Sequence, residues 1–303
     1  MIEVNGLTKR YGSTTAVDGL TFTVRPGQVT GFLGPNGSGK STTLRLILGL
    51  DAPTAGTATV SGRPFRDRRR GLRDAGALLD ATAVPAGRTA AAHLAALARG
   101  NGLPRTRVDT VLEVVGLAEV ARRQVGDYSL GMKQRLGIAA ALLGDPPVLI
   151  FDEPVNGLDP EGIRWVRGLF RGLAAEGRTV LVSSHLMSEM ENTADHLIVI
   201  GRGELIADTS VAAFLERGAR AHVEVRSPDA QALTAAVTAA GGLVTPGPGG
   251  LLEVTGLTIA QVGDLALAHH IALHELTPRR ASLEDAFMAI TADSIDYLAG
   301  DLS

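Results

Sequence analysis

The stretch Gly34-Pro-Asn-Gly-Ser-Gly-Lys-Ser41 decides the interpretation of this chain, because it fits the pattern G-x-x-x-x-G-K-[ST]. It lies between an apolar run, Val29–Leu33, and a helical pattern that begins at Lys40, which is the setting this motif needs. Glycines here let the backbone curl so that successive N–H groups converge on phosphate oxygens, and the helix N-terminus adds a favourable dipole. We therefore predict a nucleotide-binding loop.

Side-chain chemistry assigns roles within this loop. Lys40 is expected to reach the β- and γ-phosphates, and the Ser41 hydroxyl is expected to bind Mg²⁺. The alternative, a glycine-rich turn that merely precedes a helix, is disfavoured because the chain has only three lysines and one of them falls in this position. The residues predicted to hold the nucleotide here are Gly34, Pro35, Asn36, Gly37, Ser38, Gly39, Lys40, Ser41 and Thr42.

Two adjacent acids follow a second apolar run. Val148–Phe151 is typical of a buried strand, and Asp152 and Glu153 come directly after it. Alternation along a strand points neighbouring side chains in different directions, so the two carboxylates can have different tasks. Asp152 suits an indirect contact with Mg²⁺, made through one of the metal's ligands or through a bound water. Glu153 suits polarising a water for attack on the γ-phosphate. The alternative, two acids that cap a strand end in solvent, is weakened by the phosphate loop.

The chain alternates between strand and helix patterns up to about residue 210. Runs such as Val148–Phe151 and Thr179–Val182 do not alternate in polarity, which is typical of strands buried on both faces of a parallel sheet. The predicted strands are Glu3–Leu7, Leu20–Val24, Val29–Leu33, Thr57–Val60, Val148–Phe151, Thr179–Ser183 and His196–Ile200. The predicted helices are Lys40–Leu48, Thr89–Arg99, Arg105–Val115, Leu130–Leu143 and Pro160–Glu176. We predict an α/β fold.

The pattern changes after about residue 215, so we predict domains at 1–215 and 216–303. The order β-α-β-β-α-β, followed by a helix, fits a small ferredoxin-like α+β domain. Its predicted elements are Ala221–Arg226, Pro228–Ala240, Gly242–Thr245, Leu251–Thr255, Ile259–His269, Ile271–Leu276 and Ser282–Ile290. The acids that follow Arg280 are predicted to form a solvated tail rather than a binding surface; they are Glu284, Asp285, Asp293, Asp296 and Asp301.

Composition excludes several classes of protein. The 303 residues carry 29 Lys and Arg against 32 Asp and Glu, a net charge of −3, so we expect no nucleic-acid partner. An arginine-rich run at residues 63–73 is offset by Asp67 and Asp74 and is predicted to be a solvated loop. The absence of cysteine excludes disulfides, thiolate metal sites and a cysteine nucleophile. No signal peptide is visible, and apolar runs such as Leu136–Leu143 are too short to span a bilayer, so we expect a cytoplasmic protein.

Further motifs show that the chain resembles the nucleotide-binding subunits of ATP-binding cassette (ABC) transporters. Tyr128-Ser-Leu-Gly-Met-Lys-Gln-Arg135 is similar to the family motif L-S-G-G-Q-x-Q-R and stands between the phosphate loop and the acid pair, as it does there. Asn156-Gly-Leu-Asp159 resembles the loop that follows the acid pair in the family. His185 follows a buried strand as the family's switch histidine does, and Tyr11 occupies the place of the aromatic residue that stacks on adenine.

The resemblance implies a P-loop ABC ATPase domain with a parallel core sheet, an antiparallel β-subdomain and a helical subdomain. Ser129 and Gly131 precede a helix and are implied to contact the γ-phosphate of an ATP held by a second copy of the chain. ATP would then lie between the two chains of a homodimer. His185 alone would be read as an ordinary partly buried histidine, but here it is implied to donate to the γ-phosphate. The implied catalytic residues are Glu153, His185 and Lys40.

The chain departs from the family pattern in two places. Leu130 and Met132 replace a glycine and a glutamine of the family motif, while Ser129 remains. The family also has a glutamine four residues after a glycine, in a loop that senses Mg²⁺ and the membrane partner, but here Gly76 is followed by Ala-Leu-Leu-Asp80. An acid at this site resembles a bacterial subgroup linked to lantibiotic and bacitracin self-protection. We expect Asp80 to accept from a metal-bound water; alternatively, it is an ordinary surface acid.

The function implied is the ATP-binding and ATP-hydrolysing subunit of a bacterial ABC exporter, with ATP and Mg²⁺ as cofactors. Its implied partners are a second ATPase subunit and a separately encoded integral-membrane permease, which would hold it at the inner face of the cell membrane. The alternative is a soluble ABC ATPase of translation or repair type. Translation-type chains carry two cassettes, and repair-type chains carry a long coiled coil between phosphate loop and motif; this sequence shows neither pattern.

Overall fold

The computed structural model describes residues 1–69, 71–218, 222–279 and 282–288. The chain divides into two compact units, Met1–Val211 and Ala212–Ser303, a division that falls four residues before the predicted boundary at 215. Several predicted features lie outside the described residues; they are Arg70, the end of the helix predicted at Ser282–Ile290 beyond residue 288, and the acids Asp293, Asp296 and Asp301.

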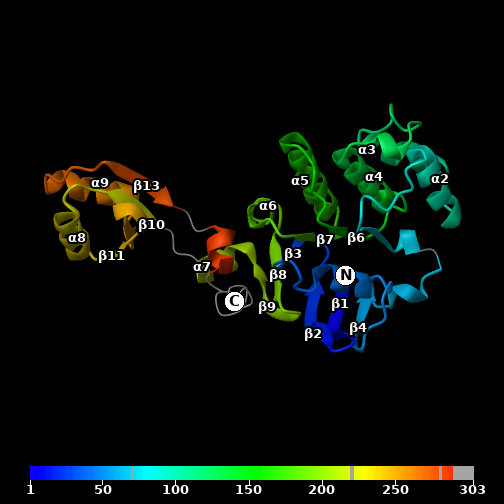
Figure 1. Ribbon diagram of the computed structural model, residues 1–303, viewed down its shortest axis with the longest axis horizontal. Helices are drawn as coiled ribbons and strands as arrows, with labels where there is room; N and C mark the ends of the chain where they lie inside the picture. The colour runs from blue at the N-terminus through cyan, green and yellow to red at the C-terminus, as the bar shows by residue number, and fades with distance from the viewer. Residues whose placement is uncertain (70, 219–221, 280–281, 289–303) are drawn as a thin grey trace, which may run out of the picture. The chain divides into compact units, whose positions relative to one another are not determined.

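A six-stranded sheet forms the centre of the first unit (Figure 1), in the order β5-β6-β7-β3-β8-β9. Its neighbours pair in parallel from β5 to β8, and β9 pairs antiparallel with β8. The strands span Val29–Leu33 (β3), Ala75–Leu78 (β5), Val148–Asp152 (β6), Thr179–Ser184 (β7), His196–Gly201 (β8) and Glu204–Ser210 (β9). Every residue of β3 and β7 is buried, in agreement with the absence of polar alternation along these strands in the sequence.

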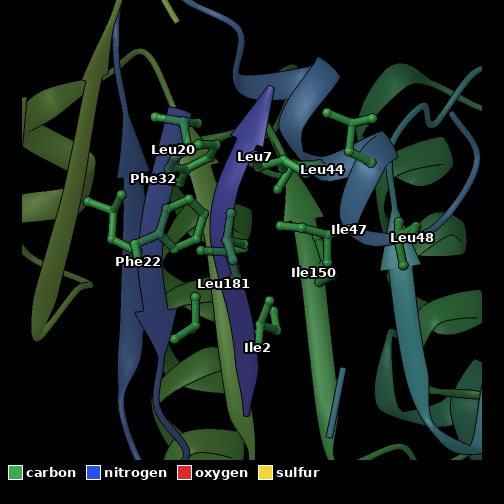
Figure 2. Close-up of a cluster of buried hydrophobic side chains, with 14 of the residues drawn as sticks. Ile2, Leu7, Leu20, Phe22, Phe32, Leu44, Ile47, Leu48, Ile150 and Leu181 are labelled. Carbon is green, nitrogen blue, oxygen red and sulfur yellow. The ribbon is translucent and has the colours of Figure 1, made fainter. Parts of the chain in front are cut away.

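A three-stranded antiparallel sheet, in the order β2-β1-β4, packs against the first. Its strands span Ile2–Tyr11 (β1), Thr14–Val24 (β2) and Ala55–Val60 (β4). One hydrophobic cluster joins the two sheets and helix α1 (Lys40–Ile47), as Figure 2 shows. Ile2, Leu20 and Phe22 reach it from the antiparallel sheet, and further side chains reach it from the parallel sheet and α1; they include Phe32, Leu44, Ile47, Ile150 and Leu181. The helix that follows the phosphate loop is thus fixed between two sheets.

Helices α2 (Ala90–Gly100), α3 (Thr106–Val114) and α4 (Leu130–Leu142) pack on one another, and Figure 1 shows them grouped together. Asp159 caps the N-terminus of helix α5 (Pro160–Ala175), because its side chain accepts from the Gly162 N–H, and a proline occupies the first turn. The short helix α6 (Met187–Glu191) follows β7, and α7 spans Val211–Gly218. None of the helices in the described residues has the length and hydropathy needed to cross a bilayer.

The second unit contains a four-stranded antiparallel sheet in the order β11-β12-β10-β13. Its elements run in the predicted order; they are β10 (His222–Arg226), α8 (Ala230–Ala239), β11 (Leu243–Pro246), β12 (Leu252–Thr255), α9 (Ile259–Ala268) and β13 (Glu275–Arg279). Its core contains Val225 of the sheet together with Leu233 of α8 and Val262 of α9. This unit is therefore a small α+β domain.

The structure differs from the sequence-based elements in a few places. The strand predicted at Ile271–Leu276 was placed too early, because only Glu275–Arg279 pairs with β10, while Ile271 and Leu273 pack against the core. Four elements, β5, β9, α6 and α7, were not predicted. Residues 283–288 are helical, which agrees with the described part of the predicted final helix.

Candidate nucleotide-binding and hydrolysis site

The loop after β3 has a backbone that only glycine permits at two positions. Gly39 has φ +100°, and a Cβ atom there would overlap the Ala16 carbonyl oxygen. A Cβ atom on Gly34 would overlap the Ile200 carbonyl oxygen and the Ser38 hydroxyl. The loop is therefore a narrow backbone cradle, the geometry in which N–H groups converge on an anion.

Lys40 is the buried cation of this cradle. Its Nζ atom donates to the carbonyl oxygens of Gly34 at 2.6 Å and Pro35 at 3.1 Å. Burial lowers the pKa of Lys40, while the charges of Glu153 and Asp152 oppose that shift. The ammonium group thus holds the loop closed and lies within electrostatic reach of both acids.

A pocket of about 270 Å³ opens beside the loop. Its lining combines loop residues with one of the two acids; the residues are Ala16, Asn36, Gly37, Gly39, Lys40, Ser41, Thr42 and Glu153. The buried Ser38 hydroxyl has no hydrogen-bond partner among the described residues, which leaves an unpaired polar atom in the cradle. Most of the predicted loop residues therefore meet Glu153 at one polar cavity, whereas Gly34, Pro35 and Ser38 do not line it.

The register of the parallel strands brings the acid pair to this edge of the sheet. Asp152 lies opposite Ser183 on β7, and the Ser183 hydroxyl donates to the Asp152 carboxylate while it accepts from the Glu153 N–H at 3.0 Å. His185 Nδ1 pairs with Glu153 Oε2 at 2.7 Å. The two carboxylates have different partners, but Glu153 lies beyond the end of β6, so the alternation expected along a strand does not separate them. Glu153 adopts φ +48°, a left-handed backbone that side chains of its size rarely take.

Gln134 of α4 also contacts Glu153 and was not predicted as a site residue. Its Nε2 atom donates to the Glu153 carbonyl oxygen at 3.2 Å. The sequence did contain a signal, because a glutamine stood at a fixed place inside the motif from Tyr128 to Arg135. Ser183 was not predicted as a site residue either, although it lies only two residues before His185 in the sequence.

Tyr11 stands at the end of β1, outside the pocket lining, and is 49% exposed. Its hydroxyl donates to Asp51 at 3.2 Å, the Thr42 side chain is a further hydrogen-bond partner, and Lys9 Nζ lies 4.8 Å from the ring centroid. Loss of solvent around the hydroxyl and the nearby Asp51 carboxylate raise the pKa of Tyr11. The contact with Thr42 places this ring beside the first turn of α1.

Ser129 and Gly131 stand apart from this pocket, at the start of α4. The Ser129 hydroxyl accepts from the Met132 N–H at 3.2 Å and caps the helix, and Ser129 itself is exposed. Leu130 packs over Gly157, because a Cβ atom on that glycine would overlap the leucine side chain. The capped helix end is therefore exposed and forms no part of this chain's own pocket.

Asp80 follows β5 at the same edge of the sheet, since Leu78 of β5 pairs with Phe151 of β6. Its carboxylate accepts from the Thr82 N–H at 2.7 Å and the Thr82 hydroxyl at 2.6 Å, and these bonds lower the pKa of Asp80. Asp80 does not line the pocket. The structure therefore shows Asp80 as an exposed, ionised side chain that closes a local turn.

The donor set beside the loop fits magnesium. Ser41 lines the pocket, and Asp152 ends β6, which is separated from β3 by β7 and precedes the pocket residue Glu153 directly. A hydroxyl and a carboxylate are hard oxygen ligands, which Mg²⁺ uses together with substrate phosphates and water.

Comparison with known proteins gives the family. A family model described as "ABC transporter" matches residues 17–156, and a domain of unknown function (DUF8746) matches residues 221–284. The bacitracin transport ATP-binding protein BcrA of Bacillus licheniformis is 44% identical over 211 residues, which cover 69% of each chain. An uncharacterised ABC transporter ATP-binding protein of Bacillus subtilis, YhcH, is 35% identical over 298 residues, or 97% of each chain.

Solved structures share the fold of the first unit. The ATP-binding cassette MJ0796, a dimer with bound ADP and Pi, superposes with a TM-score of 0.64 at 24% identity, over 70% of this chain and 99% of that one. Similarity along nearly the whole length of YhcH, together with the matched family model, shows that this chain belongs to the ATP-binding proteins of ABC transporters.

Proposed function

We propose that this chain hydrolyses ATP between two copies of itself and drives export through a separate membrane permease. Its family is that of ABC ATPases, and relatives are named for the transport of bacitracin and of lantibiotics and for Nod factor export. One observation carries the proposed roles of the residues. Lys40, Ser41 and Glu153 line a single pocket beside a glycine cradle.

Binding would begin with an exchange of partners at Lys40. Its ammonium group now donates to two loop carbonyls, and the β- and γ-phosphates of ATP would take over as acceptors. The N–H groups of the loop and of the first turn of α1 would hold the remaining phosphate oxygens. Tyr11, beside Thr42, would stack on the adenine base.

Hydrolysis would depend on Glu153 and His185. The Glu153 carboxylate can accept a proton from the attacking water, which is the role of a general base. His185 would hold that carboxylate by donating from Nδ1, which lies 2.7 Å from Glu153 Oε2. A neutral imidazole has one N–H group, so it can donate either to Glu153 from Nδ1 or to the γ-phosphate from Nε2. Only the doubly protonated ring can donate to both at once.

Ser41 and Asp152 would hold Mg²⁺, and Asp80 would accept a hydrogen bond from a water bound to the metal. When bound, the metal neutralises charge on the β- and γ-phosphates. Asp152 keeps its orientation through the Ser183 hydroxyl, which leaves its other oxygen available.

The second copy would complete the site from outside. Ser129 and Gly131 at the start of α4 would contact the γ-phosphate held by the partner chain, in line with the dimer formed by a cassette of the same fold. The permease would hold this dimer at the cytoplasmic face of the membrane. Closure on ATP and opening after hydrolysis would be passed to the permease as alternating access.

The second unit would be an accessory domain of the ferredoxin-like type, covering about residues 216–303. Its element order and its sheet order β11-β12-β10-β13 support that topology.

Co-purification with a membrane protein and ATP hydrolysis test this function. The chain, co-expressed with an integral-membrane protein encoded beside it, should co-purify with that protein in detergent and show ATP hydrolysis that Glu153→Gln reduces by about 10²- to 10⁴-fold. A chain that hydrolyses ATP but binds no membrane protein would contradict the transport role. A chain whose hydrolysis survives Glu153→Gln would contradict the assigned base.

A further inference from the structure

The backbone of Glu153 is held in an unusual conformation. Its φ of +48° lies in the left-handed region, which non-glycine residues occupy where the surrounding structure holds them. The conformation sets where the carboxylate points, because it turns the chain sharply after β6. Whatever holds this peptide also positions the proposed base.

Hydrogen bonds hold the peptide from two sides. The Glu153 N–H donates to the Ser183 hydroxyl of β7 at 3.0 Å. Its carbonyl oxygen accepts from Gln134 Nε2 at 3.2 Å and from the Asn156 N–H at 3.3 Å. Among these partners only Gln134 comes from α4, and it is 19 residues from Glu153 in the sequence.

Gln134 is an energetically unfavourable residue at its buried position. It is 6% exposed, and its Oε1 atom has no hydrogen-bond partner among the described residues. A buried, unpaired amide oxygen destabilises a protein, whereas an apolar side chain of the same size would not carry this cost. Packing alone therefore does not account for an amide here, and the Nε2 donor is the group that the site uses.

We infer that Gln134 is a positioning residue for ATP hydrolysis, acting through its amide donor on the Glu153 backbone. The inference rests on the proposed role of Glu153 as the base. Gln134 lies little more than one turn from Ser129, the residue that caps the same helix. Helix α4 thus links the end proposed to contact the partner's ATP with the base that serves this chain's own ATP.

Gln134→Met tests the donor, because methionine keeps the length of the side chain and loses the N–H. We expect kcat for ATP hydrolysis to fall by about 10- to 100-fold, since small displacements of a catalytic group have effects of this size. ATP affinity should stay within about twofold of native, because Gln134 does not line the pocket. Leu136→Met, at a fully buried neighbour on α4, is the matched control and should leave kcat near native.

A double-mutant cycle with Glu153→Gln separates positioning from a general structural effect. If Gln134 acts through the base, Gln134→Met should change the residual rate of the Glu153→Gln chain by less than about twofold. An equal fold loss in both backgrounds would overturn the inference, as would a native kcat in Gln134→Met. Gln134→Leu, which also lacks any donor, replaces Gln134→Met if that chain does not fold, and a native kcat in it has the same meaning. A native rate in Glu153→Gln alone would instead overturn the proposed function.

Discussion

Substitution of Lys40 by methionine should weaken ATP binding by an amount that its contacts allow to be worked out. In the structure Lys40 donates to the Gly34 and Pro35 carbonyl oxygens, so binding exchanges these bonds for bonds to phosphate. The net gain is of the order of one hydrogen bond to a charged group, about 1.5–3 kcal/mol. The Kd for ATP should therefore rise by about 10- to 100-fold.

Isothermal titration calorimetry of native protein and Lys40→Met with ATP and with AMP measures this effect. AMP lacks the β- and γ-phosphates, so its affinity should change little. Lys9→Met removes a lysine that lies over Tyr11 rather than in the loop, and it should alter ATP and AMP binding to the same extent. An unchanged ATP affinity in Lys40→Met, or equal losses for ATP and AMP, would refute the assignment of Lys40 to the terminal phosphates.

The pH dependence of ATP binding follows from the same residue. Because burial lowers the pKa of Lys40, its ammonium group should lose its proton at a lower pH than an ordinary lysine. The ATP affinity of the native chain should therefore fall as pH rises through that range. An affinity that falls equally in Lys40→Met would assign the titration to another group. Glu153→Gln should bind ATP normally and reduce turnover by about 10²- to 10⁴-fold in a phosphate-release assay, and a native rate would show that Glu153 is not the base. Ser129→Arg should abolish cooperative hydrolysis, because a long cation at the α4 N-terminus blocks approach to the partner's γ-phosphate; normal Hill behaviour would count against the shared site. Asp80→Gln should leave ATP affinity within a few-fold of native and alter hydrolysis and transport in the complex with the permease, whereas identical values would show that Asp80 is an ordinary surface acid.

The sequence predicted the elements whose determinants are local. The phosphate loop follows a motif with glycines at fixed positions, and one of them, Gly39, adopts φ +100°, a backbone conformation that glycine takes readily. The buried part of strand β6 appears in the sequence as the uninterrupted apolar run Val148–Phe151. Helix α5 also has local determinants, because Asp159 caps its N-terminus and Pro160 is its first residue.

Elements that depend on distant partners were not predictable in this way. Strand β5 has the sequence Ala-Gly-Ala-Leu, which has little strand propensity, and Gly76 is needed because a Cβ atom there would overlap the Ala141 backbone of α4. Helix α6 has only five residues, too few to show a helical period. The left-handed backbone of Glu153 and its bond from Gln134 join residues far apart in the sequence, so no pattern along the chain shows them.

The shared ATP site is the central claim, and the mass of the Glu153→Gln chain in solution tests it most directly. Light scattering with ATP and Mg²⁺ should give twice the 31.4 kDa of one chain, and the protein should return to one chain when ATP is replaced by ADP. The double variant Ser129→Arg, Glu153→Gln should bind ATP yet remain a single chain. A Glu153→Gln chain that is saturated with ATP and still has the mass of one chain would contradict the account.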